Sequence, residues 1–545
     1  MKKLRRRRGS FGSRPDWRTY QSGLRQARQR RNKSRTVLRS VAGLVLVGGL
    51  LYLLGGTVTT GLELYQTIRE RRAHILATTA PLPEVEAPAV EAPAKVPKPA
   101  GPSPAAEPLP DDPPAAMADS AAAGLEAAPP PAAAPAPSAD LLTAAVPEGG
   151  GCPLSEGAPA PSADTTLAAE FTAPVIDKDE IQVLFEPRCF VNLSRRAFDY
   201  DFDGRRYHIE TSIDAKLQQY MLRSIQPKYA QAIGIVVMEP DTGRILSMVS
   251  HHREDPGSNV CTESLFPAAS IFKIVTAAAA VEEFGLMPDS TVTYSGAKHT
   301  LYKSQLKRKS KRHLNRISLR DSFAQSVNPV FGKLGLQYLQ KKGLISHAEA
   351  FGFNQEIEFE LPTAASAFSI SDEPYNWAEI ASGFNRSTML SPLHGAIMAS
   401  AVVANQGRMV EPSIVDQIID SSGRVIYRSR SKTLNRALSP QSSTAMRALM
   451  KETIRTGTCR KTFRGVSRSA VLSRLNIGGK SGSINSRTHE GRRFDWFVGY
   501  AEEKEGERKI VLSIVVAHQN FIGIKSNMYA RMAIEKFFDD VGPKI

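Results

Sequence analysis

The chain has 545 residues, more than one average domain needs, so we expect a folded domain together with accessory segments. Its formal net charge of +16 would suit a nucleic-acid-binding protein, but residues 1–39 alone hold 15 of the 70 basic residues and one of the 54 acidic residues. The rest of the chain is therefore nearly neutral, which argues against a nucleic acid partner and assigns the positive charge to an N-terminal tail.

Residues 40–62 follow this tail and contain no charged side chain. As a helix, the run is long enough to cross the roughly 30 Å hydrocarbon core of a bilayer. The basic residues before it predict that the N-terminal tail, residues 1–39, stays in the cytoplasm. A cleaved signal peptide is the alternative, but the apolar run exceeds the usual length of about 7–15 residues. We therefore expect an uncleaved single-pass anchor in the cytoplasmic membrane, with the rest of the chain periplasmic or otherwise extracytoplasmic.

Residues 63–170 are expected to be a linker: of the 36 prolines in the chain, 21 lie between Pro81 and Pro161. A segment of this composition cannot bury a core, and it predicts an extended, semi-rigid and disordered spacer. Residues 171–205 show no clear pattern and are expected to be a short connecting segment. The folded domain is expected to occupy residues 206–545.

The first elements of the folded part are two short strands on either side of Asp203 and Gly204. An amphipathic helix is expected over residues 214–226, because apolar side chains recur there at helical spacing. Two strands rich in β-branched residues follow within residues 232–250. A Pro-Asp-Thr-Gly turn joins them, which predicts a hairpin.

The middle of the domain is mainly helical, with helical patterns over residues 319–340 and 394–405. The C-terminal part has three strands and a final helix, over residues 475–485, 494–503, 508–519 and 527–540. Strands at both ends with helices between them predict an α+β fold, in which the N- and C-terminal strands form one antiparallel sheet packed with a mainly helical middle.

Ser270 and Lys273 stand at the start of an apolar helical run, three positions apart. Positions i and i+3 lie on the same face of a helix, so the amine of Lys273 can reach the hydroxyl of Ser270. A serine hydroxyl becomes a good nucleophile when a neighbouring base removes its proton, and apolar surroundings lower the pKa of a lysine toward that role. Because such a pair also occurs by chance in ordinary helices, it does not by itself establish a catalytic site.

Two further motifs follow this pair along the chain. Ser326 and Asn328 form a Ser-x-Asn motif just before an apolar helical pattern, and Lys480, Ser481 and Gly482 form a Lys-Ser-Gly motif on an expected strand. The order Ser-x-x-Lys, Ser-x-Asn, Lys-[Ser/Thr]-Gly is the motif set of penicillin-recognising serine acyltransferases. The chain therefore resembles the transpeptidase domain of the penicillin-binding proteins, in the serine β-lactamase-like superfamily, over roughly residues 206–541.

The resemblance implies a chemical role for four of the motif residues. Ser270 would attack the carbonyl carbon of a D-Ala-D-Ala stem peptide and form an acyl-enzyme, with Lys273 as the general base. Ser326 would pass a proton to the leaving D-alanine amine, and Lys480 would keep this hydroxyl network electropositive. β-Lactams would be captured by the same serine, because they present a strained amide to it.

The other motif residues would bind the substrate. Asn328 would hydrogen-bond its backbone, and Lys480 with Ser481 would bind its terminal carboxylate. Gly482 would let the strand approach the substrate closely, while the backbone N–H of Ser483 and that of the nucleophilic serine would form the oxyanion hole. The resemblance implies neither a metal nor any other cofactor.

The sequence departs from the family pattern at two places. Ser481 replaces the commoner threonine, although both side chains supply a hydroxyl. Asn385 and Arg386 stand where the family often has Gly-Gln. In addition, the residues before the expected domain are mostly spacer and leave no room for a glycosyltransferase domain. We therefore expect a separate glycosyltransferase of the cell-wall machinery as a partner.

The leading hypothesis is a membrane-anchored serine D,D-transpeptidase that cross-links peptidoglycan stem peptides and binds penicillin covalently. The second is a D,D-carboxypeptidase or β-lactamase, in which water removes the acyl group from the same serine. No motif for an acidic deacylating base stands out, which disfavours rapid β-lactam hydrolysis. A third hypothesis, from another class, is a β-lactam sensor or a non-catalytic cell-wall scaffold, which the three intact motifs disfavour.

Four cysteines, Cys152, Cys189, Cys261 and Cys459, all lie in the part of the chain expected outside the cytoplasm. An oxidising compartment permits disulfides, and four cysteines allow three full pairings. Free thiols are an equally good alternative, so the pairing stays open. The sequence contains no CxxC pair, so the spacing of the cysteines does not suggest a zinc site.

Overall fold

The fold is that of a computed structural model, which describes residues 154–155, 175–307, 314–403, 406–486 and 492–539. The expected basic tail and membrane anchor lie outside the described residues, as does nearly all of the expected linker. Within the described ranges, no helix is both long enough and apolar enough to cross a membrane.

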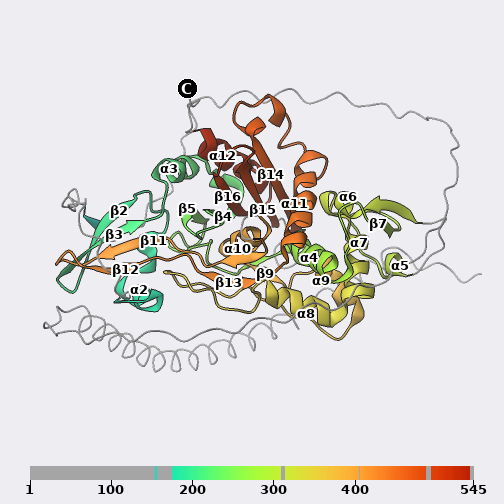
Figure 1. The fold of residues 1–545 in the computed structure, drawn as a ribbon, viewed down its shortest axis with the longest axis horizontal. Coiled ribbons are helices and arrows are strands. Elements are labelled where there is room, and N and C mark those ends of the chain that lie inside the picture. The colour runs from blue at the N-terminus through green and yellow to red at the C-terminus, as the bar shows by residue number, and fades with distance from the viewer. Residues whose placement is uncertain (1–153, 156–174, 308–313, 404–405, 487–491, 540–545) are drawn as a thin grey trace, which may run out of the picture.

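A five-stranded antiparallel sheet forms the centre of the molecule (Figure 1). Its strand order is β14 (Leu475–Asn485), β15 (Arg493–Glu503), β16 (Lys509–His518), β4 (Ala230–Met238) and β5 (Ile245–His252). β16 pairs with β4, and Ile514 lies opposite Ile235. The prediction that strands from the two ends of the domain share one sheet is therefore confirmed, and β14 forms an edge of that sheet.

Both faces of the central sheet are covered, because its strands carry apolar side chains on both sides. β4 is buried at every position. Its alternate side chains reach opposite faces, so Ile233 and Ile235 join one hydrophobic core while Val236 joins the other. The helices against these faces are α3 (Ala215–Ser224) and α12 (Ser526–Asp539) on the first and α10 (Pro392–Val403) on the second, while α11 (Pro440–Arg455) lies along β14.

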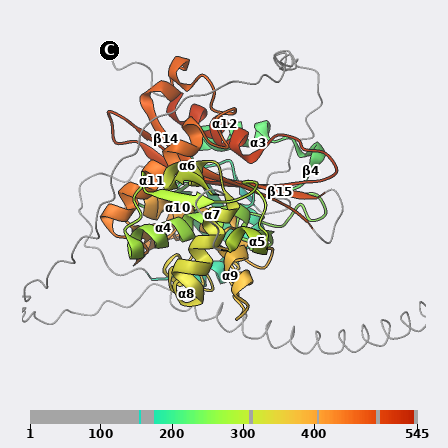
Figure 2. The same cartoon turned by 90° about the vertical axis from the view of Figure 1, so that its right-hand side faces the viewer.

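The helical middle of the domain surrounds α4 (Lys273–Phe284), which is buried along most of its length. The side chains of alanines 277–280 are fully buried. Their small size lets neighbouring elements approach the helix closely. The other helices of this part are α5 (Lys303–Leu306), α6 (Leu319–Ala324), α7 (Asn328–Lys333), a π-helix (Leu334–Leu339), α8 (Gln340–Ala350) and α9 (Pro374–Ala381), and Figure 2 shows α7, α8 and α9 next to α4.

Residues 319–340, predicted as one helical stretch, are divided into α6, α7 and the π-helix. The break lies at residues 325–327, where Ser326 has a φ of +55°. This left-handed backbone cannot continue a right-handed helix. The chain therefore turns at Ser326 and begins a new helix at Asn328, as the position of Pro329 near the start of α7 also favours.

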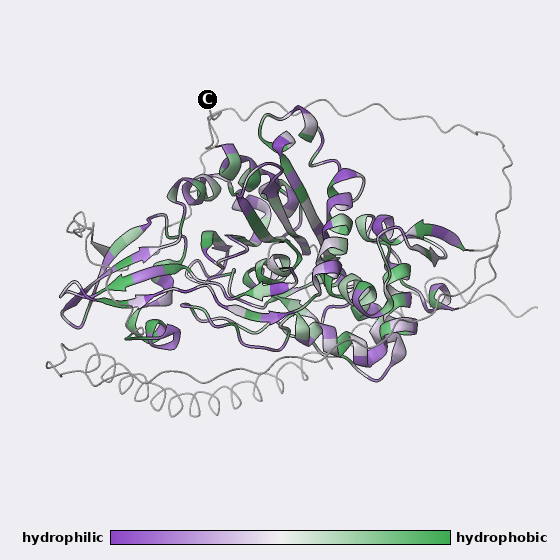
Figure 3. Cartoon of the chain, viewed as in Figure 1, coloured by the Kyte–Doolittle hydropathy of each residue, from purple (hydrophilic) through white to green (hydrophobic). Residues whose placement is uncertain are grey.

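A second five-stranded sheet lies at the end of the molecule away from these helices (Figure 1). The two strands on either side of Asp203 and Gly204 were predicted, but the strands that join them from much later in the chain were not. On β3 the buried side chains of Tyr207 and Ile209 alternate with the more exposed Arg206 and His208, an alternation of hydrophobic and hydrophilic residues that Figure 3 shows along this sheet. The strands, in order, are β1 (Leu154–Ser155), β2 (Ala197–Phe202), β3 (Arg205–Thr211), β11 (Val415–Ile419) and β12 (Val425–Arg428).

The described part of the expected connecting segment, residues 175–205, belongs to the folded unit. α2 (Lys178–Leu184) buries Ile181 and Leu184 in the main core, and β2 pairs with β3 across the boundary expected at residue 206. Three short strand pairs complete the fold: β6 (Phe266–Pro267) with β9 (Met389–Leu390), β7 (Thr291–Tyr294) with β8 (Asn315–Ser318), and β10 (Arg408–Val410) with β13 (Thr433–Arg436).

The cysteines are in two different states. Cys189 is disulfide-bonded, whereas Cys261 and Cys459 are free and fully buried. Burial raises the pKa of the Cys261 thiol to about 12, so this sulfur stays protonated. A chain with two disulfides and a chain with four free thiols are therefore both excluded.

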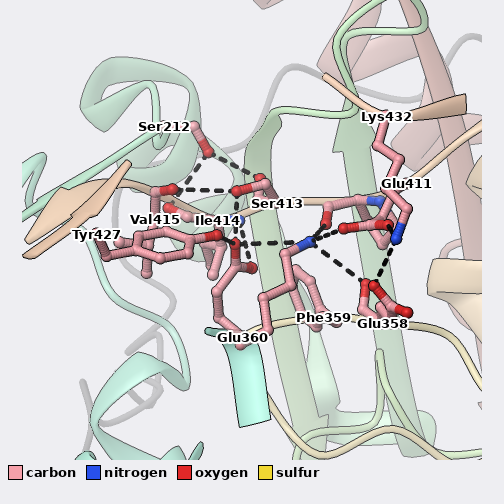
Figure 4. A network of polar contacts seen from close by, with 12 residues as sticks. Ser212, Glu358, Phe359, Glu360, Glu411, Ser413, Ile414, Val415, Tyr427 and Lys432 are labelled. Atoms are coloured by element: carbon pink, nitrogen blue, oxygen red, sulfur yellow. Dashed lines mark hydrogen bonds and ion pairs between the residues drawn. The ribbon is translucent and has the colours of Figure 1, made fainter. Parts of the chain in front are cut away.

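A buried polar network joins α2 to the second sheet (Figure 4). The carboxylate of Glu360, which is 1% exposed, accepts hydrogen bonds from the hydroxyls of Ser413 (2.6 Å) and Tyr427 (2.8 Å) and from a backbone N–H (3.1 Å). Lys178 of α2 donates a hydrogen bond to Glu411 at 2.6 Å. Because buried charges are stable only with such partners, the network fixes this junction in one arrangement.

Replacing Glu360 with alanine is expected to lower the free energy of unfolding by about 3 kcal/mol, because the hydroxyls of Ser413 and Tyr427 lose their buried acceptor. Chemical denaturation of the full chain measures the change. Glu356→Ala, at an exposed glutamate nearby in the chain, is the matched control and is expected to stay within about 0.5 kcal/mol of the unchanged protein. Equal stability of the two variants would show that the network does not stabilise this junction.

Candidate active site

Ser270 lies in a short 3-10 turn, η3 (Ala269–Phe272), that leads directly into α4. Ala269, just before it, has a φ of +48°, a left-handed conformation that is costly for a residue with a Cβ. Gly383 lies directly against this turn. A side chain does not fit at this position, because a Cβ added there would lie 1.9 Å from the carbonyl oxygen of Ala269. The turn is therefore held in a strained conformation, and it presents Ser270 to a cavity.

Lys273, the first residue of α4, is fully buried. Its Nζ donates hydrogen bonds to Ser270 Oγ at 2.9 Å, to Asn328 Oδ1 at 2.8 Å and to the carbonyl oxygen of Ser382. An ammonium group has three N–H donors, and these three acceptors match them. The contact between Lys273 and Ser270 that their spacing predicted is therefore present.

Burial lowers the pKa of the Lys273 ammonium well below its ordinary value of 10.5, and the positive charge of Lys480 lowers it further. The neutral amine keeps two N–H donors, which suffice for Asn328 and Ser382, and its lone pair can face the hydroxyl of Ser270. In that state Lys273 is a base within 2.9 Å of the oxygen whose proton it must remove.

Ser326 lies in the turn between α6 and α7, where its left-handed backbone separates the two helices, and Asn328 is the first residue of α7. The N–H of Asn328 donates to the carbonyl oxygen of Lys298 at 2.7 Å, and its side-chain amide donates to that of His299 at 3.0 Å. These bonds orient the amide so that its Oδ1 faces Lys273. The turn thus supplies one hydroxyl and one fixed amide to the site.

Lys480, in the middle of β14, is fully buried. Its Nζ donates hydrogen bonds to Ser326 Oγ at 3.1 Å and to the carbonyl oxygen of Ser481 at 2.7 Å. Burial lowers the pKa of this ammonium to about 7. Near neutral pH, Lys480 therefore exists in both its charged and its neutral form.

β14 brings its motif directly against the nucleophile turn. A Cβ added to Gly482 would lie 3.1 Å from the backbone nitrogen of Ser270, so a glycine permits this close approach. Beside Gly482 on the same strand, the hydroxyl of Ser481 is hydrogen-bonded to that of Thr458, with 2.6 Å between the two oxygens. The N–H of Thr458 in turn donates to the carbonyl oxygen of Ala324 at the end of α6. Thr458 therefore links the third motif to the end of α6, two residues before Ser326.

A cavity of about 570 Å³ opens between β14, the nucleophile turn and the turn that follows α6. This volume is typical of a small-molecule site. The structure brings all eight predicted site residues together here, with Lys273 and Lys480 buried behind the hydroxyls that they contact. The six that line the cavity are Ser270, Ser326, Asn328, Ser481, Gly482 and Ser483.

The cavity also contains residues that no sequence motif identified. Phe384 places an aromatic side chain, 42% exposed, at its wall, and His299 has a pKa lowered by burial. These residues come from loops and element ends, so their position depends on the fold and no local pattern signals it. The others are Gly383, Arg386, Thr458, Ile484, Asn485, Arg493, Asp495, Lys525 and Asn527. Among the described residues, no group of three His, Cys, Asp or Glu side chains could hold a metal ion.

Comparison with known protein families finds a match over residues 233–537 to the family described as penicillin binding protein transpeptidase domain. The match spans more than half of the chain and includes the three motifs.

Two curated relatives come from Mycolicibacterium smegmatis. Peptidoglycan D,D-transpeptidase PbpA is 26% identical over 293 residues, covering 46% of this chain and 56% of the relative. Penicillin-binding protein PbpB is 23% identical over 303 residues, covering 50% of this chain and 44% of the relative. The matched part of the chain thus spans about half the length of these relatives.

A solved structure has the same fold. The crystal structure of penicillin-binding protein 3 from Mycobacterium tuberculosis, complexed with aztreonam, gives a TM-score of 0.51 at 18% identity, covering 62% of this chain and 80% of that chain. At this identity the likeness concerns the fold alone.

Proposed function

This chain belongs to the penicillin-binding protein transpeptidase family, and from that premise we propose that it is a serine D,D-transpeptidase that cross-links peptidoglycan stem peptides and is acylated by β-lactams. The observation that carries the proposal is the fully buried Lys273 amine, 2.9 Å from the Ser270 hydroxyl. A relative named as a D,D-transpeptidase adds support.

In the proposed first step, neutral Lys273 takes the proton of Ser270 as the Ser270 oxygen attacks the carbonyl carbon of the penultimate D-alanine. The new oxygen–carbon bond replaces the bond to the terminal D-alanine nitrogen, so an acyl-Ser270 ester forms. The leaving amine needs a proton. The hydrogen bond from Lys480 to Ser326 Oγ, at 3.1 Å, supports a path in which the Ser326 hydroxyl supplies it and takes a proton from the Lys480 ammonium in turn, while the proton of Ser270 stays on Lys273. The close approach of Gly482 to Ser270 supports an oxyanion hole made by the backbone N–H groups of Ser270 and Ser483.

The terminal carboxylate of the donor peptide would bind at Lys480 and Ser481. Lys480 supplies a positive charge below its pKa, and the Ser481 hydroxyl, paired with Thr458, supplies a hydrogen bond. Asn328, whose amide is held at both ends, would hydrogen-bond the peptide backbone.

The rate constant for acylation by benzylpenicillin, which carries a carboxylate, is expected to fall as the pH rises above about 7. Below that pH Lys480 is positively charged and attracts the carboxylate, and above it the charge is lost. A penicillin methyl ester has no carboxylate and is expected to lack this fall, while it shares the other titrations of the site. Second-order acylation rates from about pH 5 to about pH 9 measure both profiles. Profiles of the same shape would exclude this role for Lys480.

The environment of the acyl group favours transfer to an amine over hydrolysis. Asp495 is the one carboxylate among the described residues that line the cavity. It accepts hydrogen bonds from the N–H and the hydroxyl of Ser526, at 2.8 and 2.9 Å. A carboxylate engaged in this way is poorly placed to activate water as a general base.

The proposal includes the location of the enzyme. The uncharged run at residues 40–62, behind a basic tail, would anchor the chain in the cytoplasmic membrane with its N-terminus in the cytoplasm. Residues 63–170, rich in proline, would carry the catalytic domain away from the outer face of the membrane. A separate glycosyltransferase would polymerise the glycan strands that carry the stem peptides.

The test is to incubate the full chain with a peptide ending in D-Ala-D-Ala, with and without an amine acceptor, and to separate the products. We expect free D-alanine and a cross-linked dimer that forms only with the acceptor. Free D-alanine without any dimer would replace the proposal with a D,D-carboxypeptidase, and fast turnover of penicillin would replace it with a β-lactamase. Stable penicillin labelling without any reaction of the peptide would indicate a sensor or a scaffold.

A further inference from the structure

The side chain of Thr458 faces the cavity beside the third motif. Its Oγ1 lies 2.6 Å from Ser481 Oγ, and both residues line the cavity. Thr458 belongs to none of the three motifs and lies on the segment between α11 and β14. The proposed function uses the hydroxyl of Ser481 and leaves open what orients its proton.

The backbone on both sides of Thr458 is fixed by packing and hydrogen bonds. The N–H of Thr458 donates to the carbonyl oxygen of Ala324 at 3.0 Å, and a Cβ added to Gly457 would lie 2.4 Å from the same oxygen. On the other side, Cys459 is fully buried, and its N–H donates to the carbonyl oxygen of Thr453 in α11 at 3.1 Å. The β-branched side chain of a threonine is also restricted in its χ1 angle. The Thr458 hydroxyl is therefore held in place before a ligand arrives.

The pair of hydroxyls has two protons to share. Each hydroxyl donates one hydrogen bond and can accept two. If Ser481 donates to Thr458, its only proton is used within the pair. If Thr458 donates to Ser481 Oγ, the proton of Ser481 is free to point into the cavity, and the bond that its oxygen accepts polarises it. A carboxylate is an acceptor only, so a carboxylate at Ser481 selects the second arrangement.

The thiol of Cys459 contacts both hydroxyls and stays neutral. Burial raises the pKa of this thiol, so the sulfur remains protonated beside Ser481 and Thr458. A neutral thiol is a weak donor and a weak acceptor, so it competes only weakly for the hydroxyl protons and does not repel a carboxylate. The residue before Ser481 is Lys480, which is positively charged below its pKa of about 7. The surroundings of the pair therefore suit an anionic ligand.

We propose that Thr458 is a positioning residue of the carboxylate site: its hydroxyl donates to Ser481 Oγ and directs the Ser481 proton toward the carboxylate of the donor peptide or of a β-lactam. The inference rests on the proposed function, which places that carboxylate at Lys480 and Ser481. It adds a residue that the three motifs do not contain. The hydroxyl of Thr458 is then needed for substrates that carry this carboxylate and not for substrates that lack it.

The test compares acylation of the full chain by benzylpenicillin and by its methyl ester, which lacks the carboxylate. Thr458→Val removes the hydroxyl and keeps a β-branched side chain of similar size. We expect it to lower the second-order rate constant about tenfold for benzylpenicillin and less than about twofold for the ester. Thr458→Ser restores a hydroxyl and is expected to return the benzylpenicillin rate to within about threefold of the unchanged chain. An equal loss for the two substrates, or no loss for either, would overturn the inference.

A second measurement tests whether Thr458 acts through Ser481. In a chain that already carries Ser481→Ala, adding Thr458→Val is expected to change the benzylpenicillin rate less than about twofold, because no Ser481 proton is left to direct. A further tenfold loss would show that Thr458 acts independently of Ser481, and the assigned role would be wrong. Thr444→Val, the same substitution at an exposed threonine of α11, is the matched control and is expected to keep both rates.

The inference and the proposed function can fail separately. A loss in Thr458→Val that is confined to benzylpenicillin, combined with no cross-linked dimer from the D-Ala-D-Ala peptide, would uphold the role of Thr458 while the proposed function fails. Cross-linking by the unchanged chain, combined with an equal loss for benzylpenicillin and its ester in Thr458→Val, would uphold the proposed function while the inference fails.

Discussion

Replacing Ser270 with alanine is expected to reduce covalent labelling of the full chain by a fluorescent penicillin to background, a loss on the order of 10⁴-fold or more. The reason is that the hydroxyl of Ser270 is the one that faces the amine of Lys273, at 2.9 Å, within the cavity. Ser326 instead accepts a hydrogen bond from Lys480, and Ser481 is paired with Thr458. The measurement is the rate of label incorporation, followed on denaturing gels.

Ser304→Ala is a suitable control for this experiment, because Ser304 is an exposed serine of α5. It is expected to label at the rate of the unchanged chain. Labelling of Ser270→Ala at an undiminished rate would mean that another side chain is the nucleophile, and the role assigned to the nucleophile turn would be wrong.

Replacing Lys273 with methionine is expected to slow acylation by about 10³-fold, the size of effect that general base catalysis supplies. Methionine is flexible and of similar length, so it can occupy much of the space that the lysine leaves in the core. It offers no lone pair basic enough to take the proton of Ser270. It also removes the donor that Asn328 Oδ1 and the carbonyl oxygen of Ser382 share.

The pH dependence distinguishes a lost base from a disturbed fold. Because burial lowers the pKa of Lys273 well below 10.5, the rate at which the penicillin methyl ester acylates the unchanged enzyme is expected to rise as the pH passes through that lowered pKa, and then to level off. With the uncharged penicillin methyl ester, Lys273→Met is expected to lose this rise. Lys341→Met, at a surface lysine paired with Asp372, is the control and keeps it. A rise of the same shape in Lys273→Met would assign the base to another group.

The chemistry of the site could be predicted from the sequence because its residues lie close together within three motifs. The i, i+3 spacing of Ser270 and Lys273 predicts their contact directly, and β14 carries Lys480, Ser481 and Gly482 in one strand. The strands of the central sheet were readable for a related reason. Their runs of β-branched residues are long and are bounded by clear turns.

Other parts depend on contacts between distant segments, which local patterns do not encode. The second sheet pairs β3 with β11, and nothing near either strand predicts that partner. The same holds for the carbonyl oxygen of Ser382 at Lys273 and for the hydroxyl of Thr458 at Ser481.

The break between α6 and α7 is a different case, because the sequence did contain a signal for it. Pro329 stands near the start of α7, where proline is favoured, and it argues against one continuous helix over residues 319–340. In the structure the break lies at Ser326, whose backbone is left-handed. The prediction of a single stretch gave the apolar periodicity more weight than the proline.

The residue that carries the acyl group after reaction with a β-lactam identifies the nucleophile. The full chain is incubated with benzylpenicillin, digested, and mapped by tandem mass spectrometry. We expect a single penicilloyl group, carried by Ser270, and its absence from the Ser270→Ala chain. A chain that stays unmodified at saturating benzylpenicillin, or one that carries the group on another residue while Ser270 is unmodified, would contradict this expectation.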